Sequence, residues 1–258
     1  MANPEPSAAC TFEIAAMSRC FDGHFPGDPI LPGAALLQLV LSRIGDAAEA
    51  EVIGLQRVRF SQPVRPGARL TMTTERVGDQ VAVAIAQADK AAATITLTTR
   101  PSETRSAEMP ALELPAVLTP AALPHAGPAI LLRRQLAADA NALLARALVP
   151  ATSAFADAAW ASLAWIEAAA QATAAHSALR AGFLNKVAPT RAVRGMLVGV
   201  KNVRLARRLR FDVECDVAVQ RVGGNGPLSI YAARVFDVDE ELMRGELSVW
   251  TQGGEHRE

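Results

Sequence analysis

Residues 23–33, GHFPGDPILPG, are the stretch from which the rest of the chain can be interpreted. Their three prolines and three glycines exclude a helix or a regular strand. They predict a rigid loop that holds His24 in one place. An apolar segment follows directly, and it predicts a helix over residues 33–44. The loop therefore delivers a histidine to the start of a buried helix.

That junction suits acid–base chemistry. The first N–H groups of a helix have no partner within the helix and carry the positive end of its dipole, so Gly33 can hold a developing oxyanion. A histidine opposite such a donor can remove a proton α to a thioester carbonyl. The alternative interpretation is a tight surface loop whose histidine has no chemical role.

The chain on either side of this loop contains a repeated pattern. Residues 53–65, IGLQRVRFSQPVR, resemble residues 198–210, VGVKNVRLARRLR, with Gly54 matching Gly199 at an offset of 145. The same offset carries ERVG at residues 75–78 onto QRVG at residues 220–223. Several matches in register favour an internal duplication.

Each half combines one apolar helix with several Val-, Ile- and Thr-rich segments. A helix too apolar to face water needs a sheet wrapped around it, and two such halves would pair their sheet edges. The sequence therefore predicts an α+β protein with antiparallel sheets and two similar domains, residues 1–100 and 121–258, joined by a proline-rich linker at residues 101–120. Helices are expected at residues 33–44 and 155–180, and strands at residues 52–60, 69–76, 81–88, 92–99, 196–205, 211–221, 228–238 and 242–251.

The composition narrows the class of protein. The 258 residues carry 26 Lys and Arg against 26 Asp and Glu, which argues against a nucleic-acid or membrane-surface binder. Three cysteines, Cys10, Cys20 and Cys215, form no CxxC motif, so we expect neither a disulfide framework nor a metal site, and no organic cofactor. No signal peptide or membrane-spanning run is evident, which predicts a cytoplasmic protein.

Three motifs resemble the β-hydroxyacyl-acyl-carrier-protein dehydratases, which have the hot-dog fold. GHFPGDPILPG at residues 23–33 is similar to that family's histidine loop. LPHAGPAILL at residues 123–132 and WIEAAAQ at residues 165–171 are similar to two other segments of the family. The halves separately resemble the two dehydratase-like proteins encoded with aryl-polyene synthases. This resemblance implies a double hot-dog fold, with each sheet wrapped around a central helix and the halves paired as a pseudo-dimer.

The resemblance also implies a histidine and, on the helix 14 positions later, an acid. The first half has His24 but Gln38 at the acid position, whereas the second half has Glu167 but Ser153 at the histidine position. In the resembling homodimers each site takes its histidine from one subunit and its acid from the other. We therefore expect one complete site from His24 and Glu167, and one vacant site from Gln38 and Ser153.

The implied reaction is dehydration of a 3-hydroxyacyl thioester to a trans-2-enoyl thioester in fatty-acid or aryl-polyene synthesis. His24 would remove the C2 proton, and Gly33, with Pro32 and Phe25, would bind the thioester. Glu167 would orient or protonate the 3-hydroxyl, the latter if burial raises its pKa. The alternative for Glu167 is a solvated helix residue. His125 is expected to be a structural or tunnel-wall residue.

A cluster of basic residues suggests a partner. Lys201, Arg204, Arg207 and Arg208 crowd one segment of the second half and would receive an acidic acyl carrier protein, or else form an ordinary solvated strand. A homodimer or a complex with other biosynthetic enzymes is also compatible with the sequence, and the thioester carrier, acyl carrier protein or CoA, stays open.

Two other functions remain open from the sequence. A hot-dog acyl-thioesterase would use Glu167 to activate water, although hydrolysis does not require the proline-framed histidine loop. A non-catalytic partner of a separate dehydratase would explain why Gln38 and Ser153 stand where a second site would need an acid and a histidine.

Overall fold

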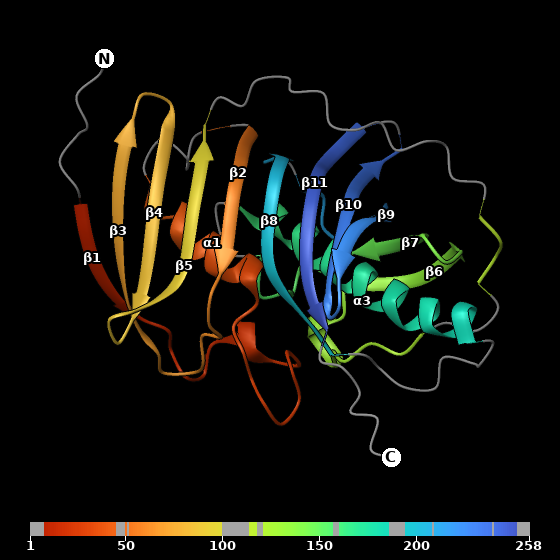
Figure 1. The fold of residues 1–258 in the computed structure, drawn as a ribbon. Coiled ribbons are helices and arrows are strands. Elements are labelled where there is room, and N and C mark those ends of the chain that lie inside the picture. The colour runs from red at the N-terminus through yellow and green to blue at the C-terminus, as the bar shows by residue number, and fades with distance from the viewer. Residues whose placement is uncertain are drawn as a thin grey trace.

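The chain forms one continuous antiparallel sheet. The computed structural model describes residues 8–44, 50, 52–99, 114–117, 121–156, 160–185, 194–207, 209–238 and 240–251. Its sheet has 11 strands in the order β1-β3-β4-β5-β2-β8-β11-β10-β9-β7-β6 (Figure 1). The predicted α+β class, with a helix inside antiparallel sheets, is confirmed. Most of the predicted linker, residues 101–113 and 118–120, lies outside the described residues.

The described residues of the first half form five strands and the α-helix α1. The helix α1, Gly33–Leu41, is apolar and ends three residues earlier than the sequence predicts. The strands are β1, Ala8–Glu13; β2, Val52–Phe60; β3, Arg69–Val77; β4, Gln80–Gln87; and β5, Lys90–Thr98. The short 3-10 helix η1, Arg19–Phe21, precedes the histidine loop.

The second half contributes six strands and the longer helix α3, Ala164–Asn185. The predicted start of this helix at residue 155 is wrong, because η3, Ala161–Leu163, and a turn precede it. The other elements are η2, Gly127–Ala129; β6, Leu132–Ala138; β7, Ala142–Leu148; β8, Gly195–Ala206; β9, Glu214–Asn225; β10, Leu228–Asp237; and β11, Glu240–Thr251.

The two halves meet where the duplicated segments pair with each other. Strand β2 runs antiparallel to β8, with Leu55 opposite Val203 and Val58 opposite Val200. The offset of 145 carries Leu55 onto Val200 and Val58 onto Val203, so each pair maps onto the other. A two-fold relation between the halves requires this. The pairing joins both sheets into one and leaves no open strand edge at the junction.

Both helices lie against the same face of the sheet, which bends around α3 at its β7–β6 end (Figure 1). Leu37 and Leu41 of α1 and Trp165 of α3 are fully buried. Helices that are apolar on every side are stable there because the sheet and the other helix cover them. The arrangement sets the histidine loop, which enters α1, beside the first turns of α3.

Two further features of the fold bear on the sequence predictions. All three cysteines are free, in agreement with the expected lack of a disulfide framework. Among the described residues, no helix has the length and apolar character needed to cross a membrane.

Candidate active site

The histidine loop folds back on itself and fixes the orientation of His24. The backbone N–H of Ile30 donates to the His24 carbonyl at 3.0 Å, and His24 Nδ1 lies 2.7 Å from the Ile30 carbonyl oxygen. A carbonyl only accepts, so Nδ1 carries the proton and a neutral ring has its lone pair on Nε2. The side chain of His24 is 11% exposed, which excludes an incidental surface histidine.

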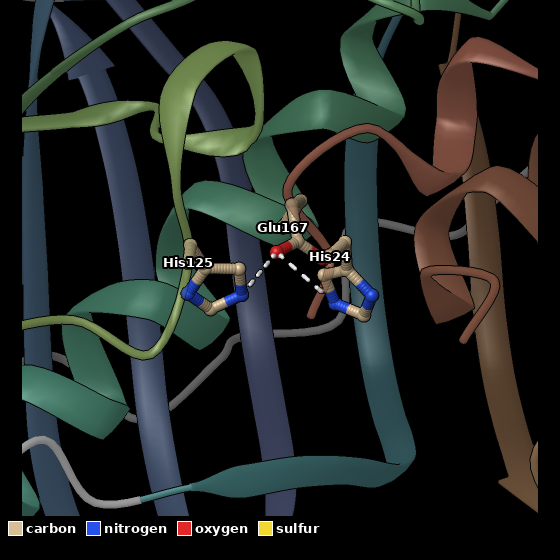
Figure 2. Close-up of side chains that lie close together, drawn as sticks. All are labelled: His24, His125 and Glu167. Carbon is tan, nitrogen blue, oxygen red and sulfur yellow. Dashed lines mark ion pairs between the residues drawn. The ribbon is translucent and has the colours of Figure 1, made fainter. Parts of the chain in front are cut away.

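Glu167 lies in the first turn of α3 and faces His24 across the two halves. Glu167 Oε1 is 3.9 Å from His24 Nε2 (Figure 2). Glu167 is 5% exposed, so the alternative of a solvated helix residue is wrong. The lone pair of His24 and the carboxylate do not bond to each other at this distance, which leaves a reacting group room to contact both.

His125 is the third member of this cluster, and the sequence did not predict its contact. Its Nε2 lies 3.4 Å from Glu167 Oε1, closer than His24 does (Figure 2). His125 comes from the loop before η2, and the backbone N–H of the following Ala126 donates to the carbonyl of Gly23 at 3.1 Å. No spacing in the sequence predicts this meeting of two distant loops.

Phe25 and Arg194 close one side of the cluster. The Phe25 ring stacks on His24 at 4.3 Å between centroids and lies 4.9 Å from the ring of His125. The Arg194 guanidinium also lies over the Phe25 ring, 4.8 Å from its centroid, and its Nη2 donates to Asp28 at 2.6 Å. Asp28 also pairs with Arg65. These contacts tie the histidine loop to the second half.

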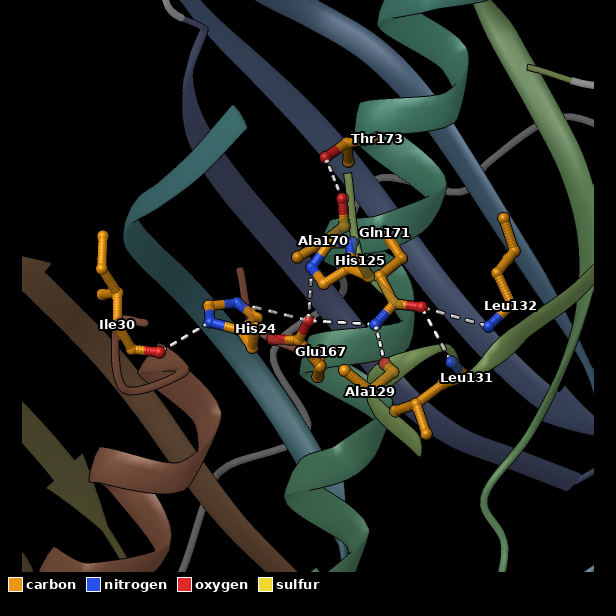
Figure 3. Close-up of polar contacts among 10 residues, drawn as sticks. All are labelled: His24, Ile30, His125, Ala129, Leu131, Leu132, Glu167, Ala170, Gln171 and Thr173. Atoms are coloured by element: carbon orange, nitrogen blue, oxygen red, sulfur yellow. Dashed lines mark hydrogen bonds and ion pairs between the residues drawn. The ribbon is translucent and has the colours of Figure 1, made fainter. Parts of the chain in front are cut away.

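Gln171, one turn after Glu167 on α3, connects the carboxylate to the His125 loop (Figure 3). Its Nε2 donates to Glu167 Oε1 at 3.1 Å and to the Ala129 carbonyl at 2.7 Å. Its Oε1 accepts from the backbone N–H groups of Leu131 and Leu132. The fully buried amide thus uses its donors and its acceptor to fix two segments at once.

The electrostatics of the cluster bear on the two roles expected for Glu167, orienting or protonating the 3-hydroxyl. Burial alone would raise the pKa of Glu167, but the hydrogen bonds from His125 and Gln171 and the charges of the two histidines outweigh it, so that its pKa is lowered. Burial lowers the pKa of His24, although the negative charge of Glu167 acts to raise it. The condition under which Glu167 could protonate the 3-hydroxyl, a pKa raised by burial, is therefore not met, and near neutral pH the site holds a carboxylate and a neutral base.

Gly33 begins α1, with Pro32 as the residue before it. No described residue accepts a hydrogen bond from the Gly33 N–H, which leaves this group available to a ligand. A Cβ at Gly33 would lie 2.9 Å from two ring atoms of Phe60, so the position has no room for a larger residue as the ring stands. Gly33 also lines an apolar cavity at the cluster, and its role as an oxyanion donor stays a prediction.

An apolar cavity opens at the cluster. His24, Phe25, Gly33, His125 and Glu167 line it together with apolar side chains of both halves. A second, smaller cavity shares His24 and Glu167 with the first and is lined also by Pro32 and Ser153. Pro32 thus lies on the second cavity, whereas Phe25 and Gly33 lie on the first.

The residues expected to form a vacant second site meet at Phe155. Gln38 Nε2 donates to the Phe155 carbonyl at 3.1 Å, and Ser153 Oγ accepts from the Phe155 N–H at 3.3 Å. Both side chains are buried. Gln38 lines neither of the two cavities, whereas Ser153 lines the one shared with His24 and Glu167.

The expected carrier-protein patch lies on β8 and the segment after it. Lys201 of β8 is exposed. In the strand register it lies opposite the exposed Arg57 of β2 on one side and opposite Glu246 of β11 on the other. Arg204 and Arg207 are half-buried, and Arg208 lies outside the described residues. The basic surface therefore includes a residue of the first half that the sequence pattern did not identify.

One donor set in the described residues could hold a metal ion. His24, His125 and Glu167 each offer one ligand atom, and these atoms lie within 4.8 Å of one another. Two imidazoles and a carboxylate suit zinc, whose bonds to such ligands are about 2.0–2.2 Å. The same three groups also suffice for proton transfer without a metal.

Comparison with known proteins places each half in a dehydratase family. Residues 1–96 match the ApeI-like model, described as ApeI dehydratase, and residues 119–256 match the ApeP-like model, described as ApeP dehydratase. The 3-hydroxyacyl-[acyl-carrier-protein] dehydratase FabZ of Nitrosospira multiformis is 36% identical over 121 residues, covering 39% of this chain and 82% of that protein. The FabZ of Chlamydia trachomatis is 38% identical over 66 residues, 21% of this chain and 43% of that protein, so the match spans less than half of that relative's length.

Solved structures match the whole chain in fold. The pyran synthase domain from module nine of the sorangicin pathway has a TM-score of 0.71 at 12% identity, covering 98% of this chain and 97% of that chain. The dehydratase domain of PpsC from Mycobacterium tuberculosis, solved with C12:1-CoA, has a TM-score of 0.66 at 14% identity, covering 95% and 94%. At these identities the likeness concerns the fold, and it confirms the double hot-dog architecture.

Proposed function

The chain belongs to the ApeP-like dehydratase family, and we propose that it eliminates water from 3-hydroxyacyl thioesters at one composite site formed by His24 and Glu167. The observation that carries this proposal is the separation of 3.9 Å between His24 Nε2 and Glu167 Oε1. One residue comes from each half, so neither half alone contains both. The N-terminal half supplies the base and the C-terminal half supplies the carboxylate.

The proposed reaction begins at His24. The lone pair on Nε2 removes a proton from C2 of the substrate, and the negative charge moves to the thioester oxygen, where the Gly33 N–H stabilises it. The electrons then form the C2=C3 double bond as the C3–O bond breaks. The proton that His24 took from C2 passes to the departing hydroxyl. The products are a trans-2-enoyl thioester and water.

Glu167 acts in this scheme as a hydrogen-bond acceptor. An ionised carboxylate has no proton to donate, which removes the role of general acid for the free protein. It can accept the hydrogen bond of the 3-hydroxyl and so hold C3 and its oxygen in line for elimination. The apolar cavity would take the acyl chain, with Phe25 and Phe60 among its walls.

An acyl carrier protein is the partner we propose for the thioester. Lys201 and its neighbour Arg57 lie on adjacent strands and offer positive charge to an acidic partner. Arg204 and Arg207 extend this surface along the second half, although Glu246 opposite Lys201 reduces its net charge. Lys201→Glu should raise KM for a carrier-bound substrate and leave KM for a small-thiol thioester unchanged. A KM for the carrier-bound substrate that is the same in Lys201→Glu and in the unaltered protein would reject this docking surface.

The test of the function is a pair of assays on the purified full chain. A 3-hydroxyacyl thioester should give the absorbance of a conjugated enoyl thioester, and His24→Ala should abolish it. A thioesterase would instead release free thiol from a saturated acyl thioester, a possibility that the ionised, buried Glu167 keeps open because a carboxylate can activate water. Thiol release without enoyl product would reject the dehydratase. A purified chain that shows neither activity, but stimulates a separate dehydratase, would favour the non-catalytic partner.

A further inference from the structure

We propose that His125 is a positioning residue of this site, which donates from Nε2 to Oε1 of Glu167 and so turns Oε2 toward the substrate hydroxyl. This inference rests on the proposed dehydration. Neither the histidine loop nor the helix motif around Glu167 includes His125, which reaches the site from a third segment of the chain. It assigns a task to a buried imidazole that the proposed proton transfer does not use.

The contacts of the carboxylate are the first argument. Within the described residues, Oε1 of Glu167 has three nitrogen neighbours: Gln171 Nε2 at 3.1 Å, His125 Nε2 at 3.4 Å and His24 Nε2 at 3.9 Å. No described residue is recorded as a partner of Oε2. Since Gln171 and His125 both contact Oε1, the other oxygen is left to a ligand. The 3.4 Å contact is loose, as such bonds often are before substrate binds.

The unusual state of the His125 ring is the second argument. Its Nδ1 is buried and has no hydrogen-bond partner within the part of the chain that the structure describes. A polar atom buried in this way is unfavourable, so an apolar side chain would fill the space better if packing were the only role. The contact that compensates for this cost is the one from Nε2 to Glu167.

The segment that carries His125 is held from both halves, which is the third argument. The Ala126 N–H donates to the Gly23 carbonyl, and Gln171 binds the carbonyl of Ala129 three residues further on. These bonds fix the distance between the imidazole and α3. A ring held in this way can direct a carboxylate with little loss of conformational freedom.

Few groups compete with this contact. In the described part of the chain, the titratable or charged groups that face the His125 ring are His24, at 5.1 Å between centroids, Glu167, and Arg194 beyond the ring of Phe25. Arg194 is engaged with Asp28. Glu167 is therefore the acceptor that His125 Nε2 meets.

Three variants separate a hydrogen-bonding role from packing. The amide nitrogen of Gln reaches the place of Nε2, whereas that of Asn reaches only the place of Nδ1, and Leu donates nothing. We expect His125→Gln to keep kcat within about tenfold. We expect His125→Asn and His125→Leu to lose about 100-fold in kcat with little change in KM, since misplacing a reacting group by about 1 Å has that effect. Equal kcat in the Leu variant and the unaltered protein would overturn the proposal.

A second measurement does not depend on activity. The carboxyl carbon of Glu167, labelled with ¹³C and assigned by its loss in Glu167→Gln, can be titrated by NMR in each variant. Loss of the His125 donor should move its titration upward by about 1–2 pH units in the Leu and Asn variants and less in the Gln variant. An unchanged titration in an active enzyme would overturn the role of His125 alone. A shifted titration in a protein that never dehydrates would reject the proposed function and keep the contact.

Discussion

His24 of the N-terminal half and Glu167 of the C-terminal half lie with Nε2 and Oε1 3.9 Å apart. The first half has Gln38 at the position where its own site would need an acid, and the second half has Ser153 where its own site would need a histidine. Among the described residues, acid–base groups of the two halves therefore meet in one cluster at the junction, and the strand pairing of β2 with β8 holds its two parts in register.

Removal of either member of this pair should nearly abolish dehydration. His24→Ala removes the base and Glu167→Gln removes the charge, and general acid–base groups contribute about 10²–10⁴-fold each. Both variants should lower kcat/KM by that order, measured by enoyl-thioester formation. His176→Gln is the matched control, because His176 is a buried histidine of α3 that contacts Tyr231 and lines neither of the two cavities. Its activity should persist, and a tenth or more of the activity in His24→Ala would contradict the assignment.

The pH dependence should show one acidic limb. Burial lowers the pKa of His24 from 6.5, so the neutral base forms as pH rises through a midpoint below 6.5, and kcat/KM should rise with it. Glu167 raises the pKa of His24, so Glu167→Gln should move the midpoint of His24 to lower pH. NMR titration of the imidazole in both proteins measures this shift. A midpoint that moves upward in Glu167→Gln would reverse the inferred sign.

How far the sequence predicts this fold depends on how local each signal is. The proline-framed loop and the apolar helix after it are encoded within residues 23–44, and both are found, with α1 ending at Leu41. The eight expected strands are present because Val-, Ile- and Thr-rich runs between turns describe them locally. Three others were missed: β1 at the edge of the sheet, and β6 and β7, whose Ala, Leu and Arg residues favour a helix as much as a strand.

The site residues that belong to a local sequence motif could be predicted, whereas those that reach the site only through a tertiary contact could not. His24, Gly33 and Glu167 were identified from their segments, and the structure brings all three to one cavity. The place of His125 depends on the approach of its loop to Gly23, which no periodicity encodes. For the same reason the sequence leaves open whether Glu167 orients or protonates the hydroxyl, because its ionisation depends on donors from residues 125 and 171.

The dehydration should not depend on a metal ion, and zinc should inhibit it. In the proposed mechanism His24 and Gly33 supply the base and the oxyanion donor, so treatment with EDTA should leave kcat unchanged. The Nε2 atoms of both histidines and Glu167 Oε1 lie within 4.8 Å, close enough for Zn²⁺ to draw them together and occupy the base. Inhibition should be competitive and weaker in His125→Gln, measured by titration of activity and by calorimetry. Loss of activity in EDTA, restored by a metal, would contradict this mechanism.

Gln38→Glu, which introduces an acid at the position of the vacant site, should destabilise the protein and create no second active site. The amide of Gln38 donates to the Phe155 carbonyl at 3.1 Å in a buried position. A carboxylate there has no proton to donate and would face that carbonyl oxygen, so Gln38→Glu should lower the free energy of unfolding by about 1–3 kcal/mol. Thermal unfolding measures the loss, and it should shrink in acid, where the introduced carboxyl group is protonated and can donate to that carbonyl. Dehydration at the His24 site should be retained, and an increase in turnover would show that a second site had formed.

A single Cβ in the histidine loop should separate the two loops of the site. At Gly23 a Cβ would lie 1.9 Å from the Ala126 carbonyl oxygen, while at Gly27, with a similar φ of +80° against +83°, it would meet nothing within 4 Å. The backbone strain of Ala is thus alike in both variants, about 1–2 kcal/mol, and only Gly23→Ala pushes the His125 loop away. We expect Gly27→Ala to unfold earlier but keep its kcat, and Gly23→Ala to lose about 100-fold in kcat as well. Equal kcat in the two variants, at matched folded fractions, would mean that the approach of these loops does not organise the site.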